Sequence, residues 1–212
     1  MLAVMAADRI TLDPRTLRGL AHPLRVRLLG LLRERGPSTA TLLAAQLGQS
    51  SAATSYHLRQ LALYGFVTDE PGRGNNRERW WRAAHRGTTV DHVEPESFGD
   101  FEAYLRAVAA QYAARVDRAL DEYATRPPQW QRVGTISDWT GQLTPEETKE
   151  LQADLFAVFE RYRRFDLDSP APEGTARVHV QFQVLPFPEV APPEMTPPEV
   201  SPAEEGTPGE AS

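Results

Sequence analysis

The sequence contains no cysteine among its 212 residues, which excludes disulfides, thiolate metal sites and thiol redox sensing. It has no apolar run near the roughly 18 residues that span a bilayer, and its first ten residues lack the features of a signal peptide. It also lacks a phosphate-binding loop, a nucleophile elbow, a metal-hydrolase helix and suggestively placed paired carboxylates. We therefore expect a cytoplasmic protein that has no membrane partner, needs no cofactor and is not an enzyme.

Charge is distributed unevenly along the chain. The whole sequence carries a formal charge of -6, but residues 1–87 hold 13 arginines against 6 acidic residues, a net charge of +7. Residues 88–212 hold 10 basic and 23 acidic residues, a net charge of -13. A basic N-terminal half is typical of a protein that binds a polyanion, and the acidic remainder is expected to face away from it.

Residues 39–64 contain two short amphipathic helical patterns separated by a tight turn. Apolar positions recur at helical spacing in both patterns. They are Leu42, Leu43 and Leu47 in the first pattern and Thr54, Leu58 and Leu61 in the second. Gly48 can adopt the positive φ that ends the first helix, and Ser50 is placed to cap the second. This arrangement predicts a helix-turn-helix.

The outer face of the second helical pattern carries small, hydroxyl-bearing and basic side chains three to four positions apart. Small residues allow close approach to base edges, hydroxyls can donate or accept hydrogen bonds there, and an arginine can reach a phosphate or a guanine. We predict that this recognition helix contacts DNA through Ser51, Ala52, Ser55, Tyr56 and Arg59. The alternative for each is the solvated face of an ordinary amphipathic helix. His57, beside Leu58, is expected to be packed and hydrogen-bonded.

Residues 66–84 have the pattern of a β-hairpin. Phe66-Val67 and Trp80-Trp81 are strand formers on either side of residues 71–76, which are rich in turn-forming residues. The two tryptophans must point to opposite sides of their strand. Polar side chains of this wing are expected to reach phosphates or the minor groove, and the alternative is a set of solvated side chains on an exposed hairpin. The predicted wing contacts are Arg73, Asn75, Arg77 and Arg79.

Three segments carry a resemblance to a known family: LAHPLRVRLLGLL at residues 20–32, LGQSSAATSYHLRQLALYGFV at 47–67 and GRGNNRERWWR at 72–82. The most specific parts are Ala21-His22-Pro23 followed by Arg25, Ser55-Tyr56-His57-Leu58 with Gln60-Leu61, and Trp80-Trp81. Over residues 14–87 the chain resembles the arsenic-repressor-type (ArsR) family of bacterial winged-helix regulators. The resemblance implies a homodimeric, cytoplasmic transcription factor, usually a repressor that a signal releases from DNA.

Residues 13–87 are therefore predicted to form a winged helix-turn-helix DNA-binding domain. Asp13-Pro14 is typical of a helix start, and His22-Pro23 separates that helix from a second one that ends at Gly36-Pro37. Residues 1–12 have no sustained periodicity and are predicted to be a flexible arm.

Residues 88–127 are predicted to be a connector and a long helix that begins near Ser97. The resemblance makes this the dimerisation helix, and the alternative is packing within the same chain. The predicted dimerisation residues are Phe98, Phe101, Leu105, Val108, Tyr112 and Val116.

Residues 128–187 are predicted to form a small strand-helix-strand unit. A strand over 136–143 precedes the capping box at Thr144, an amphipathic helix follows, and residues 178–184 alternate between apolar and polar. Aromatic side chains could line a pocket for a small-molecule effector, or they could be ordinary core. The pocket candidates are Tyr112, Trp130, Trp139, Phe159 and Tyr162. Residues 188–212 are predicted to be a disordered acidic tail.

Metal sensing is not expected. Many ArsR-type proteins bind metal through cysteines or through an Asp-X-His and a His-X-X-Glu pair on the terminal helix. Asp91-His92 lacks that spacing, and the five histidines are scattered along the chain.

The sequence as a whole predicts an α+β, mostly helical fold and a homodimeric repressor of double-stranded operator DNA. A non-thiol small molecule could control it through the C-terminal region. The alternative is a winged-helix protein-interaction module that does not read a DNA sequence.

Overall fold

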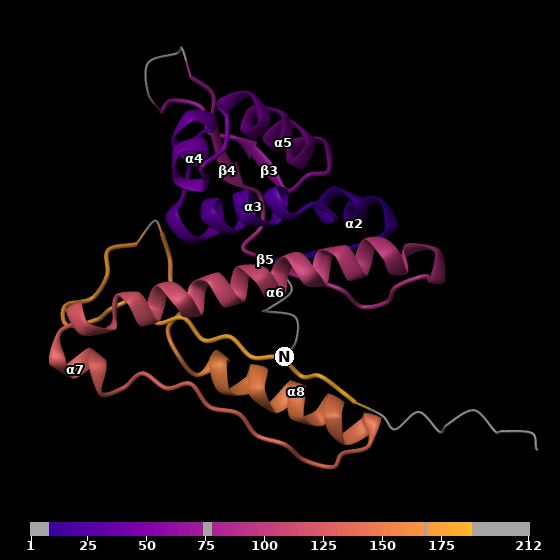
Figure 1. Cartoon of the computed structure of the whole chain (residues 1–212), viewed down its shortest axis with the longest axis vertical. Coiled ribbons are helices and arrows are strands. Elements are labelled where there is room, and N and C mark those ends of the chain that lie inside the picture. The colour runs from indigo at the N-terminus through magenta and orange to yellow at the C-terminus, as the bar shows by residue number, and fades with distance from the viewer. Residues whose placement is uncertain (1–8, 74–77, 168, 188–212) are drawn as a thin grey trace, which may run out of the picture.

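The computed structural model describes residues 9–73, 78–167 and 169–187. A winged helix-turn-helix forms the upper layer of the molecule, coloured indigo to magenta in Figure 1. Its helices are α2 (Pro14–Leu20), α3 (Pro23–Arg35), α4 (Ala40–Leu47) and α5 (Ser51–Leu63). Its strands are β2 (Ser38–Thr39), β3 (Val67–Asp69) and β4 (Trp80–Ala83). The fold is mostly helical with a small sheet, so the predicted α+β winged-helix class is confirmed.

The start and end of each of these helices follow from local hydrogen bonding. The Asp13 carboxylate accepts from the Thr16 amide at 2.7 Å, and Nδ1 of His22 accepts from the Leu24 amide at 3.1 Å. Gly48 has a φ of 62°, which ends α4, and the Ser50 hydroxyl accepts from the Ala53 amide at 3.2 Å. The predicted turn is thus confirmed.

The wing is a three-stranded antiparallel sheet in the order β2-β4-β3. β4 pairs Trp80 with Thr39 on one side and Ala83 with Val67 on the other. Trp81 is buried whereas Trp80 is half-buried, which confirms that they face opposite sides. The two-residue strand β2 was not predicted, because so short a segment has no periodicity to read.

The predicted flexible arm is wrong for residues 9–12. Arg9–Thr11 forms β1, which pairs in parallel with β5 (Gly87–Thr89), and Leu12 is buried. The Arg9 side chain donates to the hydroxyl of Thr89 at 2.8 Å. A three-residue strand whose partner lies far along the chain gives no local signal in the sequence. Residues 1–8 of the predicted arm lie outside the described residues.

One apolar core joins the winged helix to the long helix beneath it. Its members are Leu12, Leu17, Leu20, Leu24, Val26, Leu28, Leu29, Leu32, Leu43, Leu58, Leu61, Phe66, Val67, Trp81 and Ala107. Gly19 allows close packing here, since a Cβ at that position would stand 2.6 Å from the Tyr64 ring. The recognition helix is therefore held on a rigid base.

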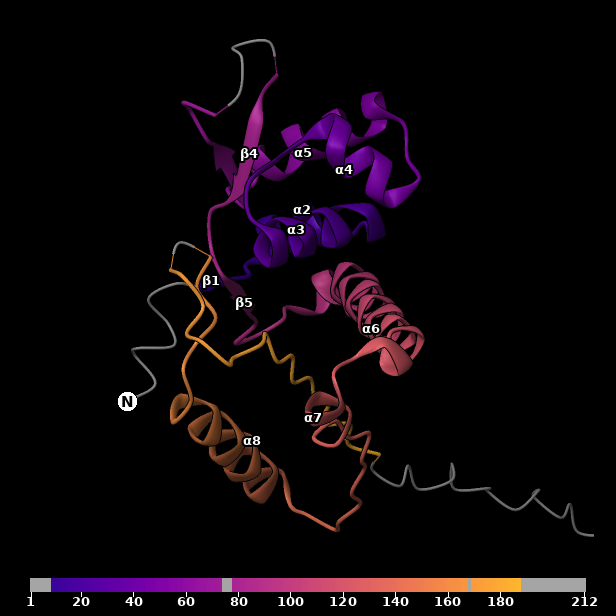
Figure 2. The ribbon, with the colours of Figure 1, turned by 90° about the vertical axis from the view of Figure 1, so that its left-hand side faces the viewer.

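The long helix α6 (Phe98–Asp121) follows a short 3-10 turn, η1 (Pro95–Ser97), and runs under α2 and α3 (Figures 1 and 2). The helix is confirmed, but its predicted apolar stripe is divided between two faces. Phe101 and Val108 pack against the core, together with Ala107, which the prediction omitted. Phe98 and Leu105 are 56% and 47% exposed, while Tyr112 and Val116 are half-buried.

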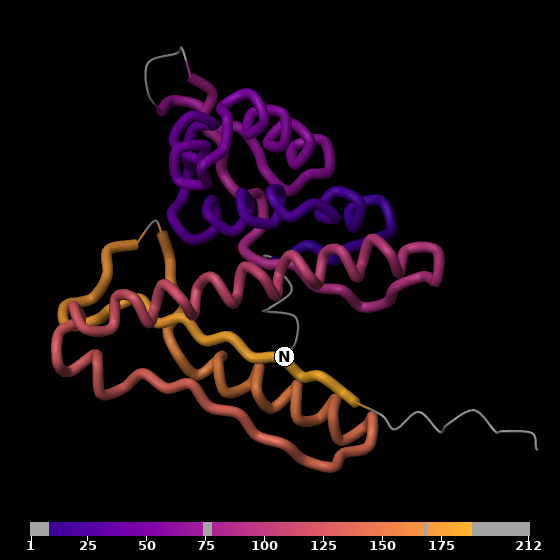
Figure 3. The backbone as a smooth tube through the Cα atoms, in the orientation of Figure 1, coloured from indigo at the N-terminus to yellow at the C-terminus, as the bar shows by residue number. Residues whose placement is uncertain are grey.

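After α6 the chain forms η2 (Tyr123–Thr125), α7 (Pro128–Gln131) and α8 (Pro145–Glu160). The predicted helix after Thr144 is confirmed, with both hydrogen bonds of its capping box. The predicted strands over 136–143 and 178–184 are wrong, because both segments are irregular and pair with no strand. The tube in Figure 3 shows residues 169–187, here called the C-terminal segment, returning between α6 and α8. The predicted tail, 188–212, lies outside the described residues.

Candidate nucleic-acid interface

The outward face of α5 presents the predicted recognition residues. Ser51, Ala52, Tyr56 and Arg59 are exposed and Ser55 is half-buried, while Thr54, Leu58 and Leu61 are buried beneath them. Arg59 folds along the helix, and its Nε donates to the carbonyl of Ser55 at 3.3 Å. The structure therefore brings the five residues onto one accessible face.

A groove of about 350 Å³ joins this face to the wing. It is lined by Thr39, Ala40, Thr41, Ser55, Arg59, Glu78, Arg79 and Trp81. Arg59 from α5 and Arg79 from the wing thus share one concave surface. The α4 residues and Thr39 were missed at the sequence level, since only β2 pairing with β4 places the start of α4 beside the wing.

Arg79 is anchored to the wing itself. Its Nη2 donates to the Asp69 carboxylate at 2.6 Å, and its guanidinium lies 4.1 Å from the centre of the Trp81 ring. The hydrogen bonds between the two side chains lower the pKa of Asp69 and raise that of Arg79. The Arg79 guanidinium is thus held in one position by Asp69 and Trp81.

The other wing arginines are held more loosely. Nε of Arg73 is 4.0 Å from Glu70, and Nη1 of Arg82 is 3.3 Å from the same carboxylate. Arg82 is a candidate that the prediction missed, although it follows from alternation along β4, because Trp81 points inward. The predicted contacts Asn75 and Arg77 lie outside the described residues.

His57 contributes to the support beneath the recognition face. Its ring centre is 4.3 Å from that of His22, and Nε of Arg25 donates to its Nδ1 at 3.5 Å. Burial lowers the pKa of His57, and the nearby His22 and Arg25 lower it further. Burial and Arg25 likewise lower the pKa of His22. His57 is packed and hydrogen-bonded, as predicted.

The five predicted effector-pocket residues do not come together. Tyr112 lines a cavity under α3, but Trp139 and Tyr162 are 70% and 68% exposed. Phe159 packs on Phe182 at 5.7 Å, and Trp130 lies half-buried in α7. The predicted single aromatic pocket is therefore wrong, because two of its five members are exposed to solvent and the others line different parts of the structure.

Two further observations limit what the chain presents. In residues 9–73, 78–167 and 169–187, histidine and carboxylate side chains form no cluster of three or more that could hold a metal ion. Among the helices formed by those residues, none combines the length and apolarity needed to cross a membrane.

Comparison with known proteins identifies the same region. The helix-turn-helix domain family matches residues 20–70, which span α3, α4, α5 and β3. No curated protein matches this chain.

The chain is also similar to several solved structures, including the following three. Apo ZitR from Lactococcus lactis is 20% identical, with 68% of this chain and 84% of that one covered and a TM-score of 0.29. A "possible transcriptional regulator for arsenical resistance" is 28% identical, with 50% and 94% covered and a TM-score of 0.29. RV1404 from Mycobacterium tuberculosis is 16% identical, with 74% and 77% covered and a TM-score of 0.28. The family match and the capped, exposed α5 together support a DNA-binding transcription regulator built on a helix-turn-helix domain.

Proposed function

We propose that this protein is a cytoplasmic, homodimeric transcription repressor of the ArsR type. The recognition helix α5 enters the major groove of operator DNA, and the wing contacts the adjacent backbone. The observation that carries the proposal is the shared surface of Arg59 and Arg79, which joins the outward face of α5 to the wing. The excess of arginine over residues 1–87 supplies the sequence-independent attraction to phosphate.

The proposed roles of the side chains follow from their positions. Ser51, Ala52, Ser55 and Tyr56 lie where a recognition helix faces base edges. Arg59 and Arg73 are proposed to bind phosphates. Asn75 and Arg77 lie outside the described residues, and their proposed wing contacts rest on the sequence pattern alone. Arg79 is proposed to contact DNA from a fixed position, because Asp69 and Trp81 hold its guanidinium.

Homodimerisation is supported by apolar surface that one chain leaves uncovered. Phe98, Leu105 and Leu120 are 56%, 47% and 56% exposed on α6, and the helix runs lengthwise beneath the winged helix (Figure 1). Large apolar side chains exposed at intervals along one helix are consistent with a protein contact. Two-fold pairing of α6 would present two recognition helices to a palindromic operator.

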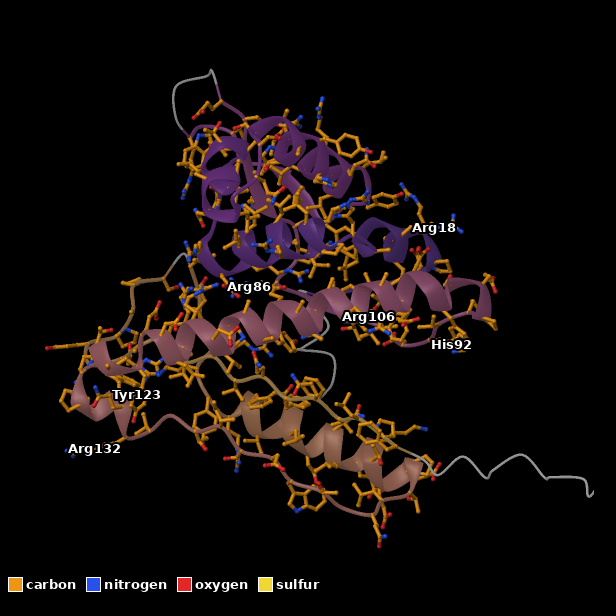
Figure 4. The ribbon with its side chains drawn as sticks, viewed as in Figure 1. Arg18, Arg86, His92, Arg106, Tyr123 and Arg132 are labelled. Carbon is orange, nitrogen blue, oxygen red and sulfur yellow. The ribbon has the colours of Figure 1, made fainter. Side chains whose placement is uncertain are left out.

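The test is binding to the DNA upstream of the protein's own gene, compared with scrambled DNA of equal length at several salt concentrations. We expect tight, selective binding that falls steeply with salt, and a loss of about 1–3 kcal/mol in Arg59→Ala. Arg73→Ala should weaken binding to both DNAs and reduce the salt slope by about 1. Arg132→Ala is the matched control, since Arg132 lies in the C-terminal region far from α5 (Figure 4).

Two outcomes would argue against this function. Equal, weak binding to both DNAs would contradict an autoregulator, and selection of operators from the whole genome would then be the deciding measurement. Failure of that selection as well would leave the winged helix as a protein-interaction module.

A further inference from the structure

A cavity of about 370 Å³ lies between α3, α6 and the C-terminal segment, on the side of the winged helix away from α5. Its floor is apolar and comes from the core, through Leu20, Val26, Leu29 and Val108. Its rim carries the charged side chains. The volume is within the range of about 300–1,000 Å³ that is typical of small-molecule sites.

Positive charge dominates the rim of this cavity. Four arginines line it against one carboxylate, that of Glu34. The lining arginines are Arg33, Arg86, Arg115 and Arg177. His179 is exposed at the rim, but partial desolvation and the nearby Arg115 lower its pKa, so this side chain is counted as neutral at pH 7. The lining carries a formal charge of +3, and it remains +2 when Asp166, the ion-pair partner of Arg86, is included, so the cavity favours an anion.

Arg115 is the arginine best placed to bind that anion. Its side chain is only 19% exposed and forms an ion pair with Glu34. Its second terminal nitrogen, Nη1, is buried and makes no hydrogen bond to any residue that the structure describes. A buried N–H without an acceptor costs free energy, and a bound carboxylate oxygen would accept from it.

The C-terminal segment closes the cavity from below. The Arg177 guanidinium stacks on Phe165 at 3.7 Å from the ring centre and donates through Nη1 to the Glu34 carbonyl at 2.5 Å. Arg86 donates to Asp166 at 3.0 Å, and Figure 4 shows Arg86 between the winged helix and α6. The aromatic rings of Tyr104, Tyr112 and Phe165 complete the walls. The site therefore combines arginines with flat apolar surfaces.

We propose that this cavity binds a small aromatic carboxylate, whose ring lies on the apolar floor and whose carboxylate meets the Arg115 and Arg177 guanidiniums. The proposal deepens the proposed function and rests on it for the meaning of the ligand as an effector. The cavity is also connected through direct contacts to the elements that are proposed to bind DNA. Nε of Arg33 donates at 2.8 Å to the carbonyl of His85, just after the last wing strand, and α3 packs directly against α5.

The test uses 2-naphthoate as the probe and 2-naphthamide, its neutral counterpart, titrated into the full chain by calorimetry without DNA. We expect 2-naphthoate to bind about tenfold more tightly than the amide, because only the anion forms charge-assisted hydrogen bonds. Inorganic phosphate should compete poorly, since it cannot use the apolar floor. Equal binding of acid and amide, no binding of either, or full competition by equimolar phosphate would each overturn the proposal.

Variants locate the site. Arg115→Gln and Arg177→Gln should each weaken 2-naphthoate binding about tenfold or more, whereas Arg118→Gln should not. Arg118→Gln is the matched control because this substitution removes the same charge from the same helix, at an exposed position outside the cavity. Arg177 lies in an irregular segment, so its substitution is informative even if Arg115→Gln fails to fold. Equal loss in all three variants would contradict the assigned site.

DNA binding by the same proteins, measured without 2-naphthoate, separates this inference from the proposed function. Binding of 2-naphthoate without operator binding would support the ligand site and contradict the proposed regulator function. A chain that binds operator but not 2-naphthoate would keep the regulator and lose the site.

Discussion

The winged helix and the C-terminal region have similar apolar patterns in the sequence but differ sharply in burial. In the winged helix, Leu28, Leu58 and Phe66 are completely buried. In the described part of residues 122–187 no side chain is buried, and Ile136 and Trp139 are 75% and 70% exposed. A periodic apolar pattern creates a core only where a second surface of the same chain covers it. The described part of the chain therefore leaves the apolar side chains of the C-terminal region uncovered.

The largest expected effect contrasts one aromatic side chain from each region. Phe66→Ala should lower the free energy of unfolding by about 3–5 kcal/mol, since it opens a cavity in a closed core. Trp139→Ala should change it by no more than about 0.5 kcal/mol in a dilute monomer. Urea unfolding monitored by circular dichroism measures both. A loss above about 2 kcal/mol in Trp139→Ala would mean that the C-terminal region is buried in solution.

The second effect tests the proposed partner surface on α6. Leu105→Glu places a charge on an exposed apolar face and should raise the dimer dissociation constant about tenfold or more. Leu63→Glu is the control, because Leu63 is also exposed, at 63%, but lies at the end of α5. Sedimentation velocity over a range of concentrations distinguishes them. An unchanged dissociation constant in Leu105→Glu, or an equal change in both variants, would argue against pairing through this face.

The contrast also explains which features could be predicted from sequence. Helix limits set by a local cap, such as Asp13, Ser50 and Thr144, could be predicted because the cap and the amide it binds lie within three residues. The start of α6 near Ser97 is different, because Ser97 makes no side-chain capping hydrogen bond and a 3-10 turn leads directly into the helix.

Features made by distant contacts could not be predicted. β1 depends on β5 some 78 positions later, and the arginine-lined cavity draws residues from α3, α6 and a segment beyond α8. The recognition face could be predicted because one helix supplies all of it. The strands predicted in the C-terminal region do not form, because an alternating pattern becomes a strand only when a partner strand is within reach.

The third effect compares two capping boxes of the same design. Asp13 caps α2, which packs against α3 and α6, whereas Thr144 caps α8, which stands apart from the winged helix in Figures 1 and 2. Asp13→Ala should lower the free energy of unfolding of the winged helix by about 1 kcal/mol. Thr144→Ala should leave that free energy unchanged and reduce only helical signal. Calorimetry together with circular dichroism at 222 nm separates the two, and equal losses would show that α8 unfolds with the core.

The smallest effect is a pH dependence confined to the winged helix. Because the pKa values of His22 and His57 are lowered on folding, the unfolded chain binds more protons as the pH falls below about 6.5. The contribution of these two histidines to the free energy of unfolding is fully present above that pH, and it declines on acidification towards their folded-state pKa values. The carboxyl group of Asp13, whose pKa is lowered from 3.8, acts only at more acidic pH. His57→Gln should flatten the decline between pH 7.5 and pH 5, as measured by urea unfolding.

His92 provides the control for this pH dependence. Its side chain is 77% exposed in the connector that leads to α6, and its Nε2 lies 3.5 Å from the Glu94 carboxylate (Figure 4). Because His92 lies away from α5 (Figure 4), His92→Gln should not remove the decline that His57→Gln removes. If His92→Gln flattened the slope as much as His57→Gln did, the acid sensitivity would not arise from the contact between His57 of α5 and His22. A flattened slope in His57→Gln alone would assign the acid sensitivity to His57 of the recognition helix α5. Protonation and DNA binding could then be measured on the same helix.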